Sequence, residues 1–204
     1  MAISCPVNLD TTSLRSEVSS IYARVAYQPD GNFHFHRGPR YAAEFLGYDA
    51  AELAALPGEC TASFAGVGNP LAMGQIASGE TVLDIGCGAG MDLLLAARRV
   101  GPRGLAIGVD MTEAMRQRAR SAAAEAGLQQ VNVRGGDATA LPVPDASVDV
   151  VISNGVLNLV PEKGKAFAEI VRVMRPGGRL QLADIVVEAE LSEEIRSNVE
   201  LWTG

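Results

Sequence analysis

The residues best suited to ligand chemistry lie in a glycine-rich turn within VLDIGCGAGMDLLLAARRVG, residues 82–101. An apolar run ends near Asp84, alternate glycines follow at Gly86, Gly88 and Gly90, and an apolar pattern of helical spacing comes next. In an open α/β sheet, such a turn at the carboxyl end of a strand is where ligands bind. A carboxylate there would favour a cationic group, although a glycine-rich turn can also be a simple tight connection.

The turn differs from the standard phosphate-binding motifs. Met91 stands where the dinucleotide fingerprint G-x-G-x-x-G needs its last glycine, and no Lys-Ser or Lys-Thr pair marks a P-loop. We therefore expect a ligand without a phosphate. Asp110 ends the next apolar run, twenty residues after Gly90, where a carboxylate can accept the hydroxyls of a ribose. A nucleoside that carries a positive charge, such as S-adenosylmethionine, suits both carboxylates.

Two later strand ends add compatible groups. Asp137 follows the run VNVRGG and can accept a hydrogen bond from the exocyclic amine of adenine. Asn154 ends the run VDVVISN and would lie beside the methyl group. Four successive strand ends thus carry chemistry that suits one ligand.

The elements that must position these residues alternate between strand and helix patterns. Helical patterns end at glycines or at an Arg-Pro-Gly-Gly turn, and the apolar runs between them cover 81–86, 105–110, 131–136, 148–154 and 179–187. This alternation predicts right-handed βαβ units and an α/β fold with a doubly wound, Rossmann-like parallel sheet.

The N-terminal part is rich in helix and loop patterns instead. Helix starts are predicted at Asp49, which forms a capping box with Glu52, and at Asn69, which precedes a proline. We expect residues 1–78 to form a helical cap and substrate lid, and residues 79–204 to form the domain that binds S-adenosylmethionine.

Charge and composition limit the choice of partners. The chain has 17 basic and 24 acidic residues, a net charge of −7 and no basic cluster, so nucleic acid is not an expected ligand. The N-terminus has no signal-peptide pattern and no eighteen apolar residues run together, so we expect a cytoplasmic protein without a membrane span. Cys5, Cys60 and Cys87 match no zinc template and are expected to be free thiols, with no metal site.

Several motifs resemble those of class I S-adenosylmethionine-dependent methyltransferases: DIGCGAG, GVDMT, GGDA, ISNGVLNLV and VMRPGGRL. The runs GVGNPLAMGQIASGETVLDIG, VGPRGLAIGVDMTEAM and SVDVVISNGVLNLVPEK, with ADIV and the terminal ELWTG, are similar to the arsenite methyltransferase family. The resemblance covers roughly residues 66–204. It implies a Rossmann-like methyltransferase domain that uses S-adenosylmethionine to methylate a small molecule.

Carried over residue by residue, the resemblance implies a set of cofactor contacts. From the methionine end through the ribose and adenine to the reacting centre, they are Asp84, Gly86, Cys87, Gly88, Gly90, Asp110, Met111, Met115, Asp137, Ala138 and Asn154. A methionine at helical spacing, such as Met115, is more often core filling. Cys87 could equally be the small side chain that a turn needs.

Two positions depart from the family pattern. Arsenite methyltransferases usually carry arsenic-binding cysteines where this chain has Val67 and Gly155. Cys60 could still reach the acceptor site, but one thiol is a poor clamp for arsenic, so we do not expect arsenite as the substrate. The resemblance then implies methyl transfer to another small molecule. The alternatives are a C- or O-methyltransferase of a quinone or polyketide-like compound, and a non-catalytic S-adenosylmethionine-binding sensor or partner subunit.

The segment GNFHFHRGPRY holds both histidines of the chain. In an extended backbone, His34 and His36 would share one face, and Phe33 and Phe35 would pack inward from the other. The histidines have no nearby acidic or cysteine partner, so we interpret them as structural or substrate-lining residues of a lid rather than as metal ligands. Asn158, in the run ISNGVLNLV, is a further candidate on the substrate side.

The class I fold continues after its fifth strand with a helix and an antiparallel hairpin, whereas this sequence ends at ELWTG. We therefore expect the hairpin strands to be missing and the run 180–187 to lie at the edge of the sheet, where its backbone would need a cover. A second copy of the chain, a second chain or the rest of a longer protein would supply that cover.

Overall fold

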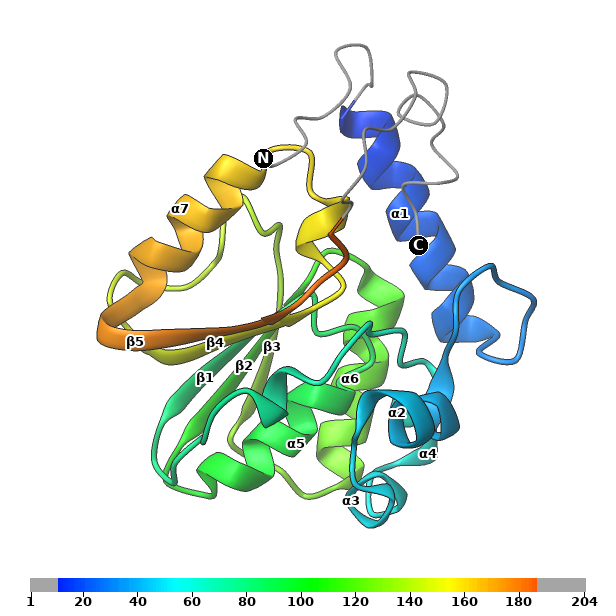
Figure 1. The fold of residues 1–204 in the computed structure, drawn as a ribbon, viewed down its shortest axis with the longest axis horizontal. Coiled ribbons are helices and arrows are strands. Elements are labelled where there is room, and N and C mark those ends of the chain that lie inside the picture. Colours follow the sequence, from blue (N-terminus) through cyan, green and yellow to red (C-terminus); the bar gives the residue numbers. More distant parts are fainter. Residues whose placement is uncertain (1–10, 187–204) are drawn as a thin grey trace.

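A parallel sheet forms the centre of the molecule (Figure 1). The computed structural model describes residues 11–186, so Cys5 and the ELWTG run lie outside the described residues. Within this range all neighbouring strands are parallel, in the order β3-β2-β1-β4-β5. The strands are β1 Thr81–Ile85, β2 Leu105–Asp110, β3 Val131–Gly135, β4 Val148–Asn154 and β5 Met174–Ala183. The expected α/β, Rossmann-like sheet is confirmed.

Helices cover both faces of the sheet. Helices α5 (Met91–Val100) and α6 (Glu113–Glu125) lie on one face, and α7 (Lys163–Val173) lies on the other (Figure 1). Side chains along each strand alternate between these layers: Val82 packs in the cluster of α5 and α6, and Leu83 packs in the cluster of α7. Burial on both faces explains why the inner strands are nearly continuous apolar runs.

The strand order reverses between β1 and β4. From β1 the chain winds outward through β2 and β3, and then it crosses back to β4 and β5. The crevice beyond the carboxyl ends of β1 and β4 is the switch point at which sheets of this kind bind their ligands.

The N-terminal part packs on the same core as the sheet. It comprises α1 Thr11–Tyr27, α2 Gly38–Leu46, α3 Ala50–Ala54, α4 Gly58–Ala62 and the 3-10 helix η1 Pro70–Ala72. Val25 of α1, Leu53 of α3 and Cys60 of α4 belong to the hydrophobic cluster that also contains α5 and α6. The described part of the cap is therefore held to the sheet domain by shared core packing.

One of the two predicted helix starts is confirmed and the other is corrected. The Asp49 carboxylate accepts a hydrogen bond from the Glu52 N–H at 2.9 Å, as a capping box requires. Asn69 precedes only the short η1 and does not cap it with its side chain. The Asn69 amide instead donates to the Gly47 carbonyl oxygen at 3.2 Å, because the loop packs against the end of α2.

Strand β5 differs from the expected run 179–187 at both ends. It begins at Met174, so the Arg-Pro-Gly-Gly turn lies inside it as an irregularity in the pairing with β4. It ends at Ala183, because the Asp184 carboxylate turns to accept from the N–H groups of Asn158 and Ile185. Any hairpin after β5 would fall outside the described residues. No helix in residues 11–186 combines the length and the hydropathy needed to cross a membrane.

Candidate active site

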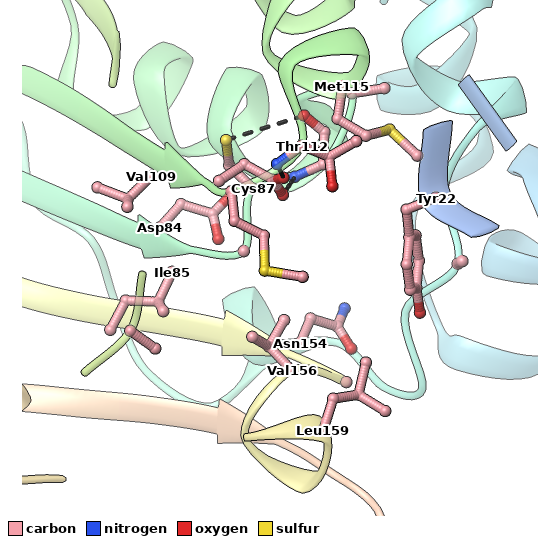
Figure 2. Close-up of a pocket in the computed structure, with 18 of the residues that line it drawn as sticks. Tyr22, Asp84, Ile85, Cys87, Val109, Thr112, Met115, Asn154, Val156 and Leu159 are labelled. Carbon is pink, nitrogen blue, oxygen red and sulfur yellow. Dashed lines mark hydrogen bonds between the residues drawn. The ribbon is translucent and has the colours of Figure 1, made fainter. Parts of the chain in front are cut away.

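A cleft opens at the carboxyl ends of β1, β2 and β4 (Figure 2). Its empty volume, which includes space open to solvent at the mouth, is about 1120 Å³. The cofactor residues expected from the sequence all line it, and they are Asp84, Gly86, Cys87, Gly88, Gly90, Asp110, Met111, Met115, Asp137, Ala138 and Asn154. The structure thus brings together residues from four strand ends.

Asp84 is the most unusual group in the cleft. It is only 3% exposed, and its Oδ2 atom has no hydrogen-bond partner in the described structure. Burial, together with the nearby carboxylates of Asp92 and Asp110, raises the pKa of Asp84 well above its ordinary value. An unpartnered buried carboxyl group is costly, so this position calls for a cationic or hydrogen-bonding ligand.

The three alternate glycines of the turn serve different needs. All have left-handed backbones, with φ of +70° at Gly86, +52° at Gly88 and +99° at Gly90. A Cβ atom on Gly86 would lie 2.3 Å from Cγ2 of Val156, so that position has no room for a side chain. A Cβ on Gly88 would meet nothing within 4 Å, which leaves the backbone open to an approaching ligand.

Asp110 ties the second strand end to the glycine turn. Its Oδ2 accepts from the Gly88 N–H at 2.9 Å, and its Oδ1 accepts from the Thr112 N–H at 2.7 Å. Tyr22 of α1 lines the same part of the cleft, and burial and the Asp110 carboxylate raise the pKa of Tyr22 to about 12. The carboxylate is held rigidly, with lone pairs left for the hydroxyls of a ligand.

Asp137 already has protein partners. Its Oδ1 accepts from the N–H and the hydroxyl of Thr139 at 2.7 and 2.6 Å, and its Oδ2 pairs with Arg15 Nε at 2.9 Å. Burial alone would raise the pKa of Asp137, but these bonds outweigh it and hold the pKa below its ordinary value. Arg15 reaches across from α1, and no sequence pattern marks it as a site residue.

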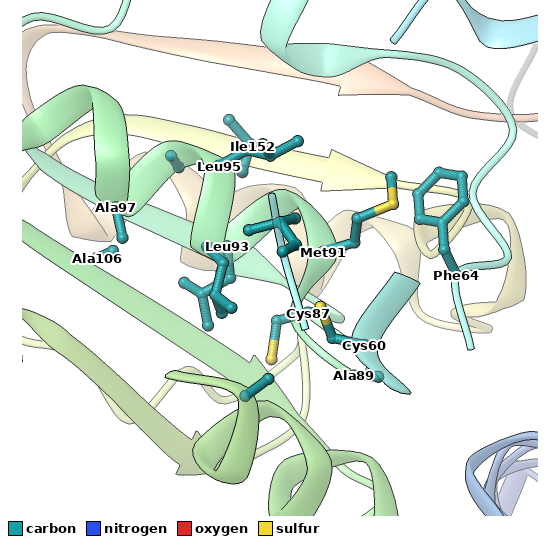
Figure 3. Close-up of a cluster of buried hydrophobic side chains, with 14 of the residues drawn as sticks. Cys60, Phe64, Cys87, Ala89, Met91, Leu93, Leu95, Ala97, Ala106 and Ile152 are labelled. Atoms are coloured by element: carbon teal, nitrogen blue, oxygen red, sulfur yellow. The ribbon is translucent and has the colours of Figure 1, made fainter. Parts of the chain in front are cut away.

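The two buried cysteines are poor nucleophiles. Cys60 and Cys87 line the cleft and belong to the hydrophobic cluster drawn in Figure 3. Burial is the main cause that raises the pKa of both thiols, to about 12 for Cys60. Both are therefore protonated thiols near neutral pH, which lack the reactivity of a thiolate.

The other substrate-side candidates lie away from the cleft. His34 contacts Phe35 edge-on and His36 stacks on Tyr41, with both histidines exposed and Phe33 and Phe35 packed inward as expected. Within residues 11–186, no group of three or more His, Cys, Asp or Glu side chains could hold a metal ion. Asn158 does not line the cleft, and its N–H bonds to Asp184.

Other residues form the walls in their place. Helix α1 contributes Arg15, Val18 and Tyr22, and the cap contributes the segment from Ser63 to Gly66. Another wall is apolar and comes from Val156, from Leu159 in the 3-10 helix η2 (Leu157–Leu159), and from Val160 and Pro161. None of these residues is among the predicted site residues. Those of α1 carry no motif and reach the cleft only through tertiary packing, whereas Val156, Leu159 and Val160 lie in the run ISNGVLNLV.

Residues 76–204 match the protein family described as a methyltransferase domain. This chain belongs to that family. The arsenite methyltransferase of Halobacterium salinarum is 46% identical over 162 residues, which are 79% of this chain and 41% of the relative. The nocamycin O-methyltransferase of Saccharothrix syringae is 40% identical over 115 residues, which are 56% of this chain and 41% of the relative. The crystal structure of an arsenic(III) S-adenosylmethionine methyltransferase from Chlamydomonas reinhardtii has a TM-score of 0.66 and 37% identity, covering 72% of this chain and 52% of that one.

These matches confirm the expected likeness to class I methyltransferases and to the arsenite methyltransferases among them. The chain spans about two fifths of the length of the curated relatives given above. S-adenosylmethionine is the cofactor expected of this methyltransferase family, and the cleft fits it. Asp84 and Ser63 line the cleft, and their buried Oδ2 and Oγ atoms have no hydrogen-bond partner in the described structure, so both atoms could bond to a polar ligand. The space beside Gly88, where a Cβ atom would meet nothing within 4 Å, leaves room for such a ligand.

Proposed function

We propose that this protein binds S-adenosylmethionine in the cleft and passes its methyl group directly to a small-molecule acceptor. The observation that carries the proposal is the buried, unpartnered Asp84 carboxyl group beneath the glycine turn, with Asp110 at the next strand end. Two acidic groups joined by a glycine turn suit a cationic nucleoside. The family match and the relatives named above support this assignment.

The residues divide the binding between them. Asp84 would hold the ammonium group of the cofactor, Gly88 would let its methionine portion approach the backbone, and Asp110 would accept from the ribose hydroxyls. When bound, S-adenosylmethionine supplies an electrophilic sulfonium methyl group. The apolar wall of Val156 and Leu159 would keep water from that end of the cleft.

The acceptor end lacks a thiolate pair. The two positions where arsenite methyltransferases usually carry cysteines are neighbours in this fold, since a Cβ on Gly155 would lie 3.3 Å from Cγ1 of Val67. Both positions are apolar here, and burial raises the pKa of the Cys60 thiol, which lines the same cleft. We therefore propose an acceptor other than arsenite. The likeness to an O-methyltransferase supports a more specific proposal, in which the acceptor is an organic hydroxyl group or a carbon nucleophile.

One experiment separates these proposals. Calorimetry measures S-adenosylmethionine binding, and release of S-adenosylhomocysteine is assayed with arsenite, methylarsenite, thiols, quinols and phenols. Asp84→Asn is the test variant, and Arg40→Gln, which removes an exposed ion pair far from the site, is the control. Turnover with an organic acceptor supports the proposal. Binding without turnover across the panel supports a sensor or partner subunit, and absence of binding overturns both.

Two further proposals concern the location of the protein and its assembly. We place the protein in the cytoplasm, since protonated, unbridged thiols at Cys60 and Cys87 suit a reducing compartment. We also propose that a second copy or another chain covers the outer edge of β5, which pairs only with β4 within the described sheet. Light scattering would show the oligomer, and slow amide exchange at Leu180 and Leu182 in a strict monomer would contradict this second proposal.

A further inference from the structure

Asn154 makes more hydrogen bonds to the rest of the protein than any other polar side chain that lines the cleft in the described structure. Its Oδ1 atom accepts from the N–H groups of Val67 and Gly68, at 2.8 and 3.1 Å. Its Nδ2 atom lies within hydrogen-bond distance of the Gly68 carbonyl oxygen at 2.8 Å, Asp92 Oδ2 at 3.0 Å and Tyr48 Oη at 3.1 Å. The amide is thus fully used by the protein and has no proton left for a ligand.

Tyr48 and Asp92 fix the orientation of this amide. The Tyr48 hydroxyl donates to Asp92 Oδ1 at 2.6 Å, and both residues are only 6% exposed. Asp92 lies in the first turn of α5, directly after the glycine turn, whereas Tyr48 comes from the link between α2 and α3. A side chain from the cap and one from the first turn of α5 therefore meet at the end of β4.

The segment from Gly66 to Gly68 is packed tightly around this amide. A Cβ on Gly66 would lie 2.3 Å from Asn154 Nδ2, and a Cβ on Gly68 would lie 2.8 Å from Cβ of Ala183. The segment packs against Asn154 at the end of β4 and Ala183 at the end of β5, and Gly66 lines the cleft. Within the described structure the N–H groups of Val67 and Gly68 bond only to Asn154. The Gly68 carbonyl oxygen accepts from Asn154 Nδ2 and also lies 3.1 Å from the Tyr48 hydroxyl.

We propose that Asn154 is a positioning residue, which together with Tyr48 and Asp92 fixes the segment 66–68 as part of the wall at the acceptor end of the cleft. The inference rests on the proposed function, because the wall matters only if an acceptor binds against it. Asn154 does not then bind the cofactor through its amide. Its loss should disturb the acceptor's KM and kcat and leave the affinity for S-adenosylmethionine nearly unchanged.

The test uses amide hydrogen exchange at Val67 and Gly68, which needs no substrate. Asn154→Ala removes the only acceptor of these two N–H groups in the described structure, and their exchange should accelerate about tenfold or more. Tyr48→Phe removes one hydroxyl and should give a smaller acceleration at the same two amides. Val171→Ala, an exposed change on α7, is the matched control and should change neither rate.

Calorimetry on the same proteins completes the experiment. Affinity for S-adenosylmethionine within about threefold of the native value, with faster exchange at both amides, supports the positioning role. Unchanged exchange in a folded Asn154→Ala variant overturns it, as does a tenfold loss of cofactor affinity with both amides still protected. If Asn154→Ala does not fold, unchanged exchange in Tyr48→Phe overturns the proposal. Failure of all acceptors in the turnover assay would count against the proposed function alone, because the exchange result is independent of it.

Discussion

Arg15 and Asp137 form an ion pair of 2.9 Å, from Nε to Oδ2, that joins α1 to the loop after β3. A second pair of 2.8 Å joins Arg15 Nη2 to Glu162, next to α7. Because Asp137 is expected at the adenine edge, one side chain of the cap closes that end of the cleft. A ligand that enters there must share the carboxylate with Arg15 or displace it.

Arg15→Gln should therefore speed cofactor exchange. We expect the dissociation rate of S-adenosylmethionine to rise about three- to tenfold, since the helix that covers the cleft loses its ionic attachment. The loss in stability should stay below about 1 kcal/mol, because each partner is about a third exposed and water screens the pair. Stopped-flow displacement measures the rate, with Arg40→Gln as the control. An unchanged dissociation rate would contradict a closing role for Arg15.

The affinity for S-adenosylmethionine should depend on pH through Asp84. In the free protein, burial and the neighbouring carboxylates raise the pKa of Asp84, whereas the cofactor's ammonium group needs the ionised form. Binding should thus tighten as the pH rises toward that pKa, by up to about tenfold per pH unit, with release of a proton. Calorimetry in buffers of different ionisation enthalpy measures both effects.

Asp84→Asn serves as the control for that titration. It should weaken binding by roughly 1.5 to 3 kcal/mol, the usual scale for a hydrogen bond to a charged group. It should also flatten the pH dependence. The same pH slope in the variant and the native protein would assign the titration to another group.

The sequence was most informative where the determinants are local. The glycine turn after β1, Asp110 at the end of β2 and the alternation of helix and strand follow from short-range patterns, and the structure brings these residues together. The alternation of Phe33 and Phe35 with two histidines also predicted which side chains face inward. It could not predict where that segment packs, and the histidines lie away from the cleft.

The unpredicted part of the site depends on residues far apart in the chain. Arg15 meets Asp137 across 122 positions, and Tyr48 meets Asp92 across 44. No periodicity or motif connects such pairs, because tertiary packing of the cap on α5 and α6 brings them together. Asn154 lines the cleft, and its side-chain partners come from these distant segments.

Gly86 and Gly88 should differ in their tolerance of alanine. Gly86→Ala combines a left-handed backbone with a Cβ 2.3 Å from Val156, and it should destabilise the fold by about 3 kcal/mol or more. Gly88→Ala meets no neighbour, so its cost should be near 1 kcal/mol from the backbone alone. Urea unfolding measures both. Adding Val156→Ala should recover part of the Gly86→Ala loss, and equal costs at the two glycines would contradict this account.

The free energy of unfolding should fall as the pH rises from about 4 to 6, through Asp92. Burial raises the pKa of Asp92 to about 6 despite the bonds from Tyr48 and Asn154, whereas an unfolded chain keeps the ordinary value of 3.8. In that window the folded state binds the proton and the unfolded state has lost it, so each step up in pH favours unfolding. The loss should be on the order of 2 kcal/mol.

Asp92→Asn removes this titration. It also removes a charge that helps to raise the pKa of Asp84, so both changes make the pH dependence shallower, whereas burial still raises the pKa of Asp110. The neutral amide can donate to the Tyr48 hydroxyl, which can then turn to the Gly68 carbonyl oxygen 3.1 Å away, so the cluster keeps its bonds. Urea unfolding at several pH values should show a shallower decline for this variant than for the native protein, with the exposed Asp30→Asn as the control. Identical slopes in the native protein and in Asp92→Asn would show that Asp92 does not take up the proton.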